Sequence, residues 1–101
     1  MVGQMSEEIV FVVSWPSGKV DQFRVKRKPE QLVINLDSAD YEATYELPVD
    51  RFAEFNKSFG FPESADPMAV VTWMLSTGDQ RAVADAIQAA GQRVSSWSQF
   101  L

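Results

Sequence analysis

The most regular alternation of apolar and polar residues in the chain lies between positions 41 and 47. Apolar side chains occupy every second position there: Tyr41, Ala43, Tyr45 and Leu47. Because successive side chains of a strand point to opposite faces of a sheet, this period of two predicts a β-strand with one buried face. Residues 9–15 are rich in β-branched and aromatic residues and also predict a strand, and residues 32–36 are a further strand candidate.

A turn signal separates the first of these strands from the segment that follows it. Pro16-Ser17-Gly18 combines a residue with a fixed φ and a residue that tolerates a positive φ. Residues 19–26 then alternate again, so the two segments predict a β-hairpin. Residues 9–47 are therefore predicted to form a small antiparallel β-meander of about four strands.

From Pro48 onward the apolar residues recur with a helical period. Phe52, Phe55 and Phe59 stand at i, i+3 and i+7, and Asp66-Pro67 is a typical helix start. The same period predicts a helix that begins at Asp66, another that follows Gly78, and a final turn or helix. That last segment carries Val94, Trp97 and Leu101. We therefore predict three to four short helices over residues 48–101.

These patterns predict an α+β fold in one domain, residues 9–101, in which the meander of residues 9–47 precedes the helical residues 48–101. A length of 101 residues and an apolar fraction of 46% suit a single domain with a real core. Residues 1–8 are expected to be flexible, since they are mostly polar and lie outside any periodic segment.

The amino-acid composition excludes the commonest catalytic residues and metal ligands. The chain has no histidine and no cysteine, so the commonest general base, the thiolate nucleophile and the usual ligands of zinc are absent. The carboxylates follow no calcium-loop spacing, and the glycines follow no phosphate-binding spacing. We expect a protein that is not an enzyme, with no catalytic residue, no metal and no cofactor.

The charge distribution bears on partners and location. The net charge is −5, although five of the nine basic residues lie between Lys19 and Lys28. The basic residues 24–28 either dock an acidic partner segment or RNA, or block strand addition at a hairpin edge. An acidic protein is a poor match for nucleic acid, and no apolar stretch approaches the ~20 residues that span a bilayer. With no signal peptide recognisable, we expect a cytoplasmic protein that contacts neither nucleic acid nor membrane.

The apolar character of the helical part leaves two interpretations open. Two tryptophans and two methionines occur between Met68 and Trp97. Either these side chains are all core, or some of them form an exposed groove, because methionine and tryptophan are common where a surface accepts apolar partners.

The order of elements in residues 32–101 resembles a known family. A strand that ends in "YELP", a helix that opens with "DP" and ends in "LSTGDQ", a small-residue helix and the terminal "RVSSWSQF" carry the likeness. Its anchor positions are Tyr45, Pro48, Pro67, Gly78-Asp79 and Trp97. In these features the chain resembles tail assembly chaperones of long-tailed, siphovirus-type bacteriophages.

The resemblance implies a non-enzymatic helper in the host-cell cytoplasm. Such proteins cover apolar helices of the tape-measure protein and deliver it to the tail-tube protein. The partner-binding apolar face would then include seven residues: Met68, Val71, Trp73, Met74, Val83, Ile87 and Trp97.

Two alternatives come from other functional classes. A small acidic inhibitor or immunity-type protein would occupy a basic site on an enzyme through an acidic belt. That belt comprises Asp37, Asp40, Glu42 and Glu46. A structural subunit would instead form a homo-oligomer through a free strand edge, for which residues 32–36 are the candidate.

Overall fold

The computed structural model describes residues 8–39 and 41–98, and for residues 95–98 it describes the backbone alone. In chain order the elements are β1 (Glu8–Ser14), β2 (Val20–Lys28), β3 (Gln31–Asp37), β4 (Tyr41–Pro48), the 3₁₀ helix η1 (Val49–Arg51), α1 (Phe52–Lys57), α2 (Pro67–Ser76), α3 (Gln80–Ala90) and β5 (Gln92–Ser98). The fold is α+β, as the sequence predicts.

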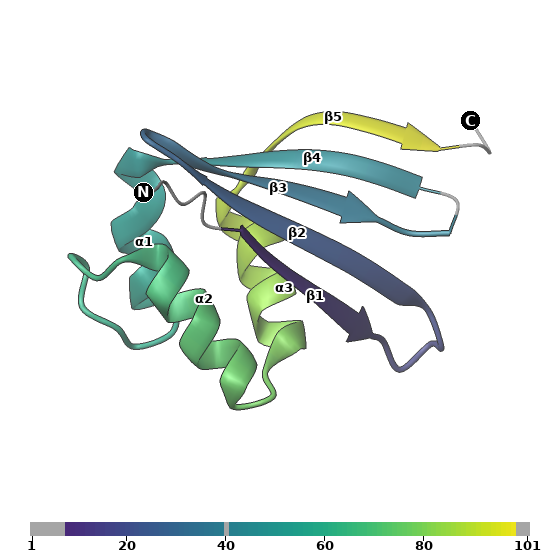
Figure 1. Ribbon diagram of the computed structural model, residues 1–101, viewed down its shortest axis with the longest axis horizontal. Coiled ribbons are helices and arrows are strands. Elements are labelled where there is room, and N and C mark those ends of the chain that lie inside the picture. The colour runs from purple at the N-terminus through teal and green to yellow at the C-terminus, as the bar shows by residue number, and fades with distance from the viewer. Residues whose placement is uncertain (1–7, 40, 99–101) are drawn as a thin grey trace, which may run out of the picture.

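The five strands form one antiparallel sheet in the order β1-β2-β3-β4-β5 (Figure 1). The first four follow one another as a meander, and each pairs with its neighbour in sequence. The chain then leaves the sheet for the helices and returns as β5, which pairs with the free side of β4. The edge strands of the sheet are therefore β1 and β5.

The prediction of a final turn or helix is wrong for residues 92–98. This segment is β5, with Ser98 opposite Tyr41 and Gln92 opposite Glu46 in the backbone register. Leu101, the last residue of the predicted helical stripe, lies outside the described residues. Three apolar residues at helical spacing favour a helix here, but the backbone groups on the free side of β4 need hydrogen-bond partners. Pairing of this segment with β4 supplies them.

The candidate free edge at residues 32–36 is also wrong. These residues belong to β3, which is paired on one side with β2 and on the other with β4. At the N-terminus, Glu8 is already part of β1, whereas the expectation for residues 1–7 concerns a part of the chain that the structure does not describe.

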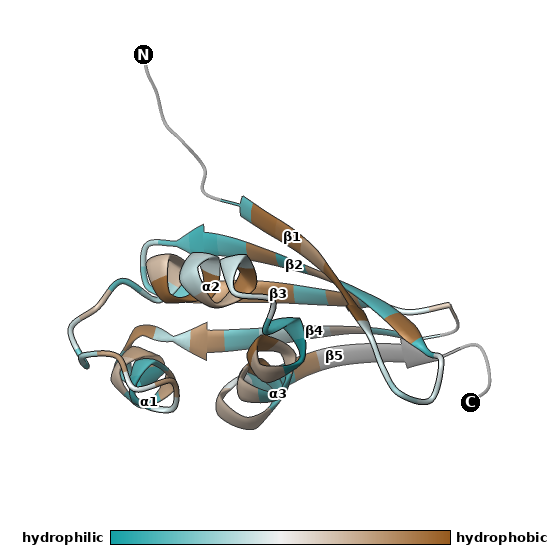
Figure 2. Cartoon of the chain, turned by 90° about the horizontal axis from the view of Figure 1, so that it is seen from below, coloured by the Kyte–Doolittle hydropathy of each residue, from teal (hydrophilic) through white to brown (hydrophobic). Residues whose placement is uncertain are grey.

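The helices cover one face of the sheet (Figure 2). The side chains that point from the sheet toward the helices form the core together with apolar residues of all three α-helices. In the strands these buried residues are Phe11, Val13, Phe23, Val25, Leu32, Ile34, Leu36, Ala43, Tyr45 and Leu47, and in the helices they are Phe52, Phe55, Met68, Val70, Val71, Val83, Ala84 and Ile87. We call the opposite side, which no described helix covers, the open face.

Candidate binding groove

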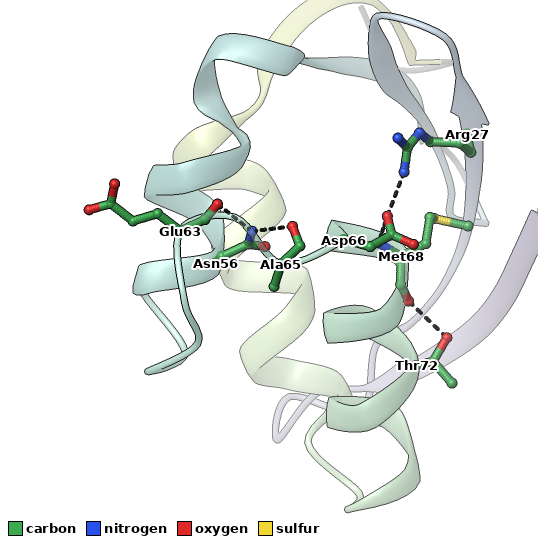
Figure 3. A network of polar contacts seen from close by, with 7 residues as sticks. All are labelled: Arg27, Asn56, Glu63, Ala65, Asp66, Met68 and Thr72. Atoms are coloured by element: carbon green, nitrogen blue, oxygen red, sulfur yellow. Dashed lines mark hydrogen bonds and ion pairs between the residues drawn. The ribbon is translucent and has the colours of Figure 1, made fainter.

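Helix α2 begins at a well-formed N-cap. The Asp66 side chain accepts a hydrogen bond from the Met68 backbone amide, with 3.3 Å between Oδ1 and N, and Pro67 occupies the first turn (Figure 3). An aspartate in this position satisfies a backbone amide that the helix itself leaves unpaired, and it complements the helix dipole. At the other end, Gly78 adopts a φ of 87°, which ends the segment without strain on a side chain.

Apolar residues occur on two sides of α2. Val70 and Val71 are fully buried, and Met68 is nearly so, which fixes the helix on the core. Trp73 points the other way, and 59% of its surface is exposed. An exposed indole beside further apolar surface is a candidate contact residue, because contiguous exposed apolar patches often mark interaction sites.

A groove lies between this exposed side of α2 and the edge strand β1. It has a volume of about 650 Å³ and is open to solvent. Its lining comprises Glu8, Ile9, Asp66, Met68, Ala69, Thr72, Trp73 and Ser76. Ala69, Thr72, Trp73 and Ser76 follow one another at i, i+3, i+4 and i+7, so one helix face forms the whole wall.

Two polar side chains of this wall have their hydroxyl groups occupied within the helix. Thr72 Oγ1 donates to the Met68 carbonyl at 2.8 Å, and Ser76 Oγ donates to the Trp73 carbonyl at 2.7 Å. Such bonds to the preceding turn satisfy the hydroxyl donors locally. The wall therefore presents mainly apolar surface, and the hydroxyl donors of Thr72 and Ser76 need no hydrogen-bond acceptor from a partner.

The acidic residues at the groove are each paired with an arginine of β2. Arg24 Nη1 donates to Glu8 Oε2 at 2.7 Å, and Arg27 forms an ion pair with Asp66. The hydrogen bond from Arg24 is the main reason that the pKa of Glu8 lies below its usual value. Both negative charges are thus neutralised locally, which makes the groove a site for apolar rather than cationic groups.

The seven residues of the predicted apolar face are distributed over different environments. Val71, Val83 and Ile87 are buried in the core, and Met74 packs against the core while remaining partly exposed. Met68 and Trp73 line the groove. The side chain of Trp97 lies outside the description, although its backbone pairs with Glu42.

Sequence reasoning missed the remaining groove residues. Ile9 comes from a strand about 60 positions away, so no local pattern connects it with α2. Ala69, Thr72 and Ser76 do share a helical period with Trp73, and this stripe of small residues beside a tryptophan was the signal available in the sequence.

The acidic belt lies on the open face. Asp37 and Glu42 are directly opposite each other on β3 and β4, and both are exposed. Glu46 follows on the same face of β4, whereas Asp40 is outside the described residues. Arg24 lines the same hollow of about 230 Å³ as Asp37 and Glu42, so a basic group already stands beside the two carboxylates.

Within residues 8–39 and 41–98, no group of three or more acidic side chains is placed to hold a metal ion. In the same part of the chain, no helix has the length and apolar character needed to cross a bilayer.

Comparison of the chain with models of known protein families, with curated proteins and with solved structures gave no match.

Proposed function

We propose that the protein is a non-enzymatic tail assembly chaperone that covers apolar helices of a phage tape-measure protein. Its docking site is the groove between β1 and α2. The observation that carries this proposal is the exposure of Trp73 over a groove whose wall is apolar. Full burial of an exposed aromatic side chain by a partner contributes favourably, because tryptophan removes about 150–250 Å² from water.

The dimensions of the groove suit a helix as the occupant. Helix α2 has ten residues, and at a rise of about 1.5 Å per residue its exposed wall extends for about 15 Å. A partner helix that lies beside it would present about three turns, with apolar anchors at i, i+3 or i+4, and i+7. Ile9 and Met68 would contact the anchors from the sheet side, and Trp73 would cover them from the solvent side.

The acidic body supports the same role. A tape-measure helix exposes apolar stripes that aggregate unless another protein covers them. A partner with a net charge of −5 keeps such a complex soluble, because like-charged particles repel one another. The resemblance of residues 32–101 to tail assembly chaperones supplies the tape-measure protein as the specific partner.

A co-expression experiment tests the proposal. The tape-measure protein of the same phage is produced alone, with the wild-type chain, and with Trp73→Asp or Val94→Asp. Val94 is a matched control, since it is an exposed valine on β5 at the opposite edge of the sheet. We expect the wild type and Val94→Asp to keep the tape-measure protein soluble, and Trp73→Asp to fail while remaining folded by circular dichroism.

Salt dependence provides the second arm of the experiment. An apolar contact persists at 1 M NaCl, where the screening length falls to about 3 Å, whereas an ionic contact fades. Equal solubilisation by both variants, or loss of the complex of the wild type at high salt, would show that the groove is not the docking site.

A second candidate function has one observation in its favour. Asp37 and Glu42 face each other across β3 and β4, and two like charges in this position repel each other. A cationic partner would relieve that repulsion, as expected of an acidic inhibitor of an enzyme with a basic site. Asp37→Asn together with Glu42→Gln would then abolish binding of the target enzyme, and binding would weaken steeply as salt rises.

A further inference from the structure

The free edge of β1 offers backbone groups for pairing. The β1–β2 hairpin closes through the Trp15 amide, which donates to the Lys19 carbonyl at 2.8 Å, and through the Gly18 amide, which donates to the Trp15 carbonyl at 2.9 Å. In an antiparallel ladder the residues alternate between those whose backbone groups face the partner strand and those whose groups face away. Counting back from Trp15, the amide and carbonyl groups of Val12 and Val10 face away from β2.

A side-chain contact supports this assignment. Arg81 of α3 donates from Nε to the Ser14 carbonyl at 2.9 Å. Ser14 is two residues after Val12 and four after Val10, so in the alternating pattern its carbonyl also points away from β2. Arg81 covers the C-terminal end of the edge, and none of the described residues pairs with the edge groups of Val10 or Val12.

The middle of this edge lacks the features that usually prevent strand addition. Sheet edges are commonly protected by proline, lysine, a bulge or a charged side chain that points inward. Strand β1 contains neither proline nor lysine, and its register with β2 runs without a shift from Glu8 to Ser14. On the open face, Val10, Val12 and Val20 are each about half exposed. The edge is therefore flat and apolar.

We propose that β1 pairs in antiparallel orientation with β1 of a second copy of this chain, about a two-fold axis at Phe11. In this register Val10 lies opposite Val12 of the second copy, and the hydrogen bonds between these residues hold the pair. Glu8 lies opposite Ser14 of the second copy, whose carbonyl keeps its bond to Arg81. The two five-stranded sheets become one continuous sheet, with the valines of both copies adjacent on the open face. The same surface contacts itself, as a two-fold interface requires.

Charge complementarity favours this occupant and this register. Arg81 is bound to the Ser14 carbonyl, so in the dimer the guanidinium of one copy lies beside the Glu8 position of the other. At each end of the strand pair, the Glu8 carboxylate of one copy, which is already paired with its own Arg24, lies near Arg81 of the other copy. If the register between the two β1 strands shifts by two residues, Arg81 no longer lies beside Glu8 of the other copy, and fewer residues of the two strands pair.

The proposed dimer is independent of the chaperone proposal. The strand pair uses outward backbone groups and side chains of the open face, whereas the groove uses Ile9 and the wall of α2. Glu8 is the residue that both surfaces share. The two grooves lie at opposite ends of the strand pair. A single pair of short strands buries at most about 1,200 Å², the range of weak and transient complexes, so we expect dissociation at micromolar concentrations.

Sedimentation velocity of the full chain tests the dimer, at concentrations from about 1 µM to about 1 mM to bracket a micromolar Kd. We expect the wild type to shift from monomer to dimer within this range. Val12→Lys places a positive charge beside the valines of the second copy and raises Kd at least about tenfold. Val33→Lys is the control, since Val33 lies on the open face of the central strand β3 and leaves the edge untouched.

A second variant removes a backbone donor instead of changing a charge. Val12→Pro deletes an amide that faces away from β2, so the hairpin survives while the strand pair loses a hydrogen bond. A mixture of labelled and unlabelled protein gives intermolecular NOEs between Val10 and Val12 if the register is correct. A monomer at every concentration, or a dimer that both Val12 variants leave unchanged, overturns the proposal. Loss of helix binding in Trp73→Asp without loss of the dimer separates the two proposals.

Discussion

Asp66 accepts hydrogen bonds from two parts of the fold, the Met68 amide at the start of α2 and the Arg27 guanidinium of β2 (Figure 3). One carboxylate thus caps the helix and ties it to the sheet. The Arg27 guanidinium also lies 5.5 Å from the centre of the Phe52 ring, which adds a cation–π contact. The position of the groove wall relative to the sheet depends on this pair.

Replacement of Asp66 separates its two roles. Asp66→Ala removes both the cap and the ion pair, and we expect a loss of about 1 kcal/mol, with up to about 2 kcal/mol for a well-formed cap. Asp66→Asn keeps a capping oxygen and removes only the partly exposed ion pair, which contributes between about 0 and 1 kcal/mol. Urea denaturation of both variants measures the difference. Equal losses would show that the cap contributes nothing to stability.

Asn56 holds the loop that leads to Asp66. Its side chain is fully buried, and Nδ2 donates to the carbonyls of Glu63 and Ala65 at 3.2 Å and 2.8 Å. Asn56→Ala removes both hydrogen bonds, and since the Glu63 and Ala65 carbonyls belong to exposed or partly buried residues, we expect a cost of about 0.5–1.5 kcal/mol for each bond lost. Asn35→Ala is the control, because Asn35 is exposed and its Nδ2 donates an exposed hydrogen bond to Thr44 Oγ1. A similar midpoint for both variants would contradict the anchoring role.

Local patterns predicted the meander and failed where distant segments meet. The alternation around Tyr45 identified β4 because one face of that strand is buried and the other is solvated. The segment after Gly91 carries no such alternation, and its partner strand β4 lies some 50 residues earlier. A strand of this kind is defined by the edge that it completes, so its own sequence carries a weak signal.

The groove was predictable only in part for the same reason. Trp73 marked α2 as a candidate contact surface, but a helix with apolar residues on several sides does not reveal which side faces the core. The buried positions of Val71 and Val83 follow from the packing of α2 and α3 on the sheet. Ile9, at the far end of the chain, joins the groove only because β1 is an edge strand.

Gly91 connects α3 to β5 through a close backbone approach. Its φ of −79° and ψ of 156° suit any residue, but a Cβ added here would lie 2.6 Å from the Ile87 carbonyl oxygen. Gly91→Ala therefore forces the end of α3 away from the start of β5, and we expect a loss of about 1–3 kcal/mol, as for overpacked interiors. Thermal unfolding measures the loss, and amide exchange in β5 should rise more than in β2. If Gly91→Ala is as stable as the wild type, the backbone around Gly91 accommodates the added Cβ without a loss in the free energy of unfolding.

Tyr45 makes stability depend on pH in the alkaline range. Burial, which disfavours the phenolate, raises the pKa of Tyr45 above its ordinary value of 10.0. Below pH 10 the phenol is protonated in both states, so its contribution is fully present. Above pH 10 the unfolded chain releases this proton first, and the free energy of unfolding falls as pH rises through the folded pKa. Tyr45→Phe should show a shallower decline above pH 10 in urea titrations, and parallel curves would refute the shift.

The two tryptophans whose side chains are described should differ sharply in their effect on stability. Trp73 is mostly exposed, so Trp73→Ala should change the free energy of unfolding by no more than about 0.5 kcal/mol. Trp15 instead donates from Nε1 to the buried Asp21 Oδ2 at 2.9 Å, and the other oxygen of that carboxylate has no described partner. Trp15→Phe removes the donor and should cost about 1–3 kcal/mol. Urea denaturation of the two variants side by side gives the comparison. A large loss for Trp73→Ala would assign this residue to the core and remove the exposed aromatic side chain on which the binding proposal depends.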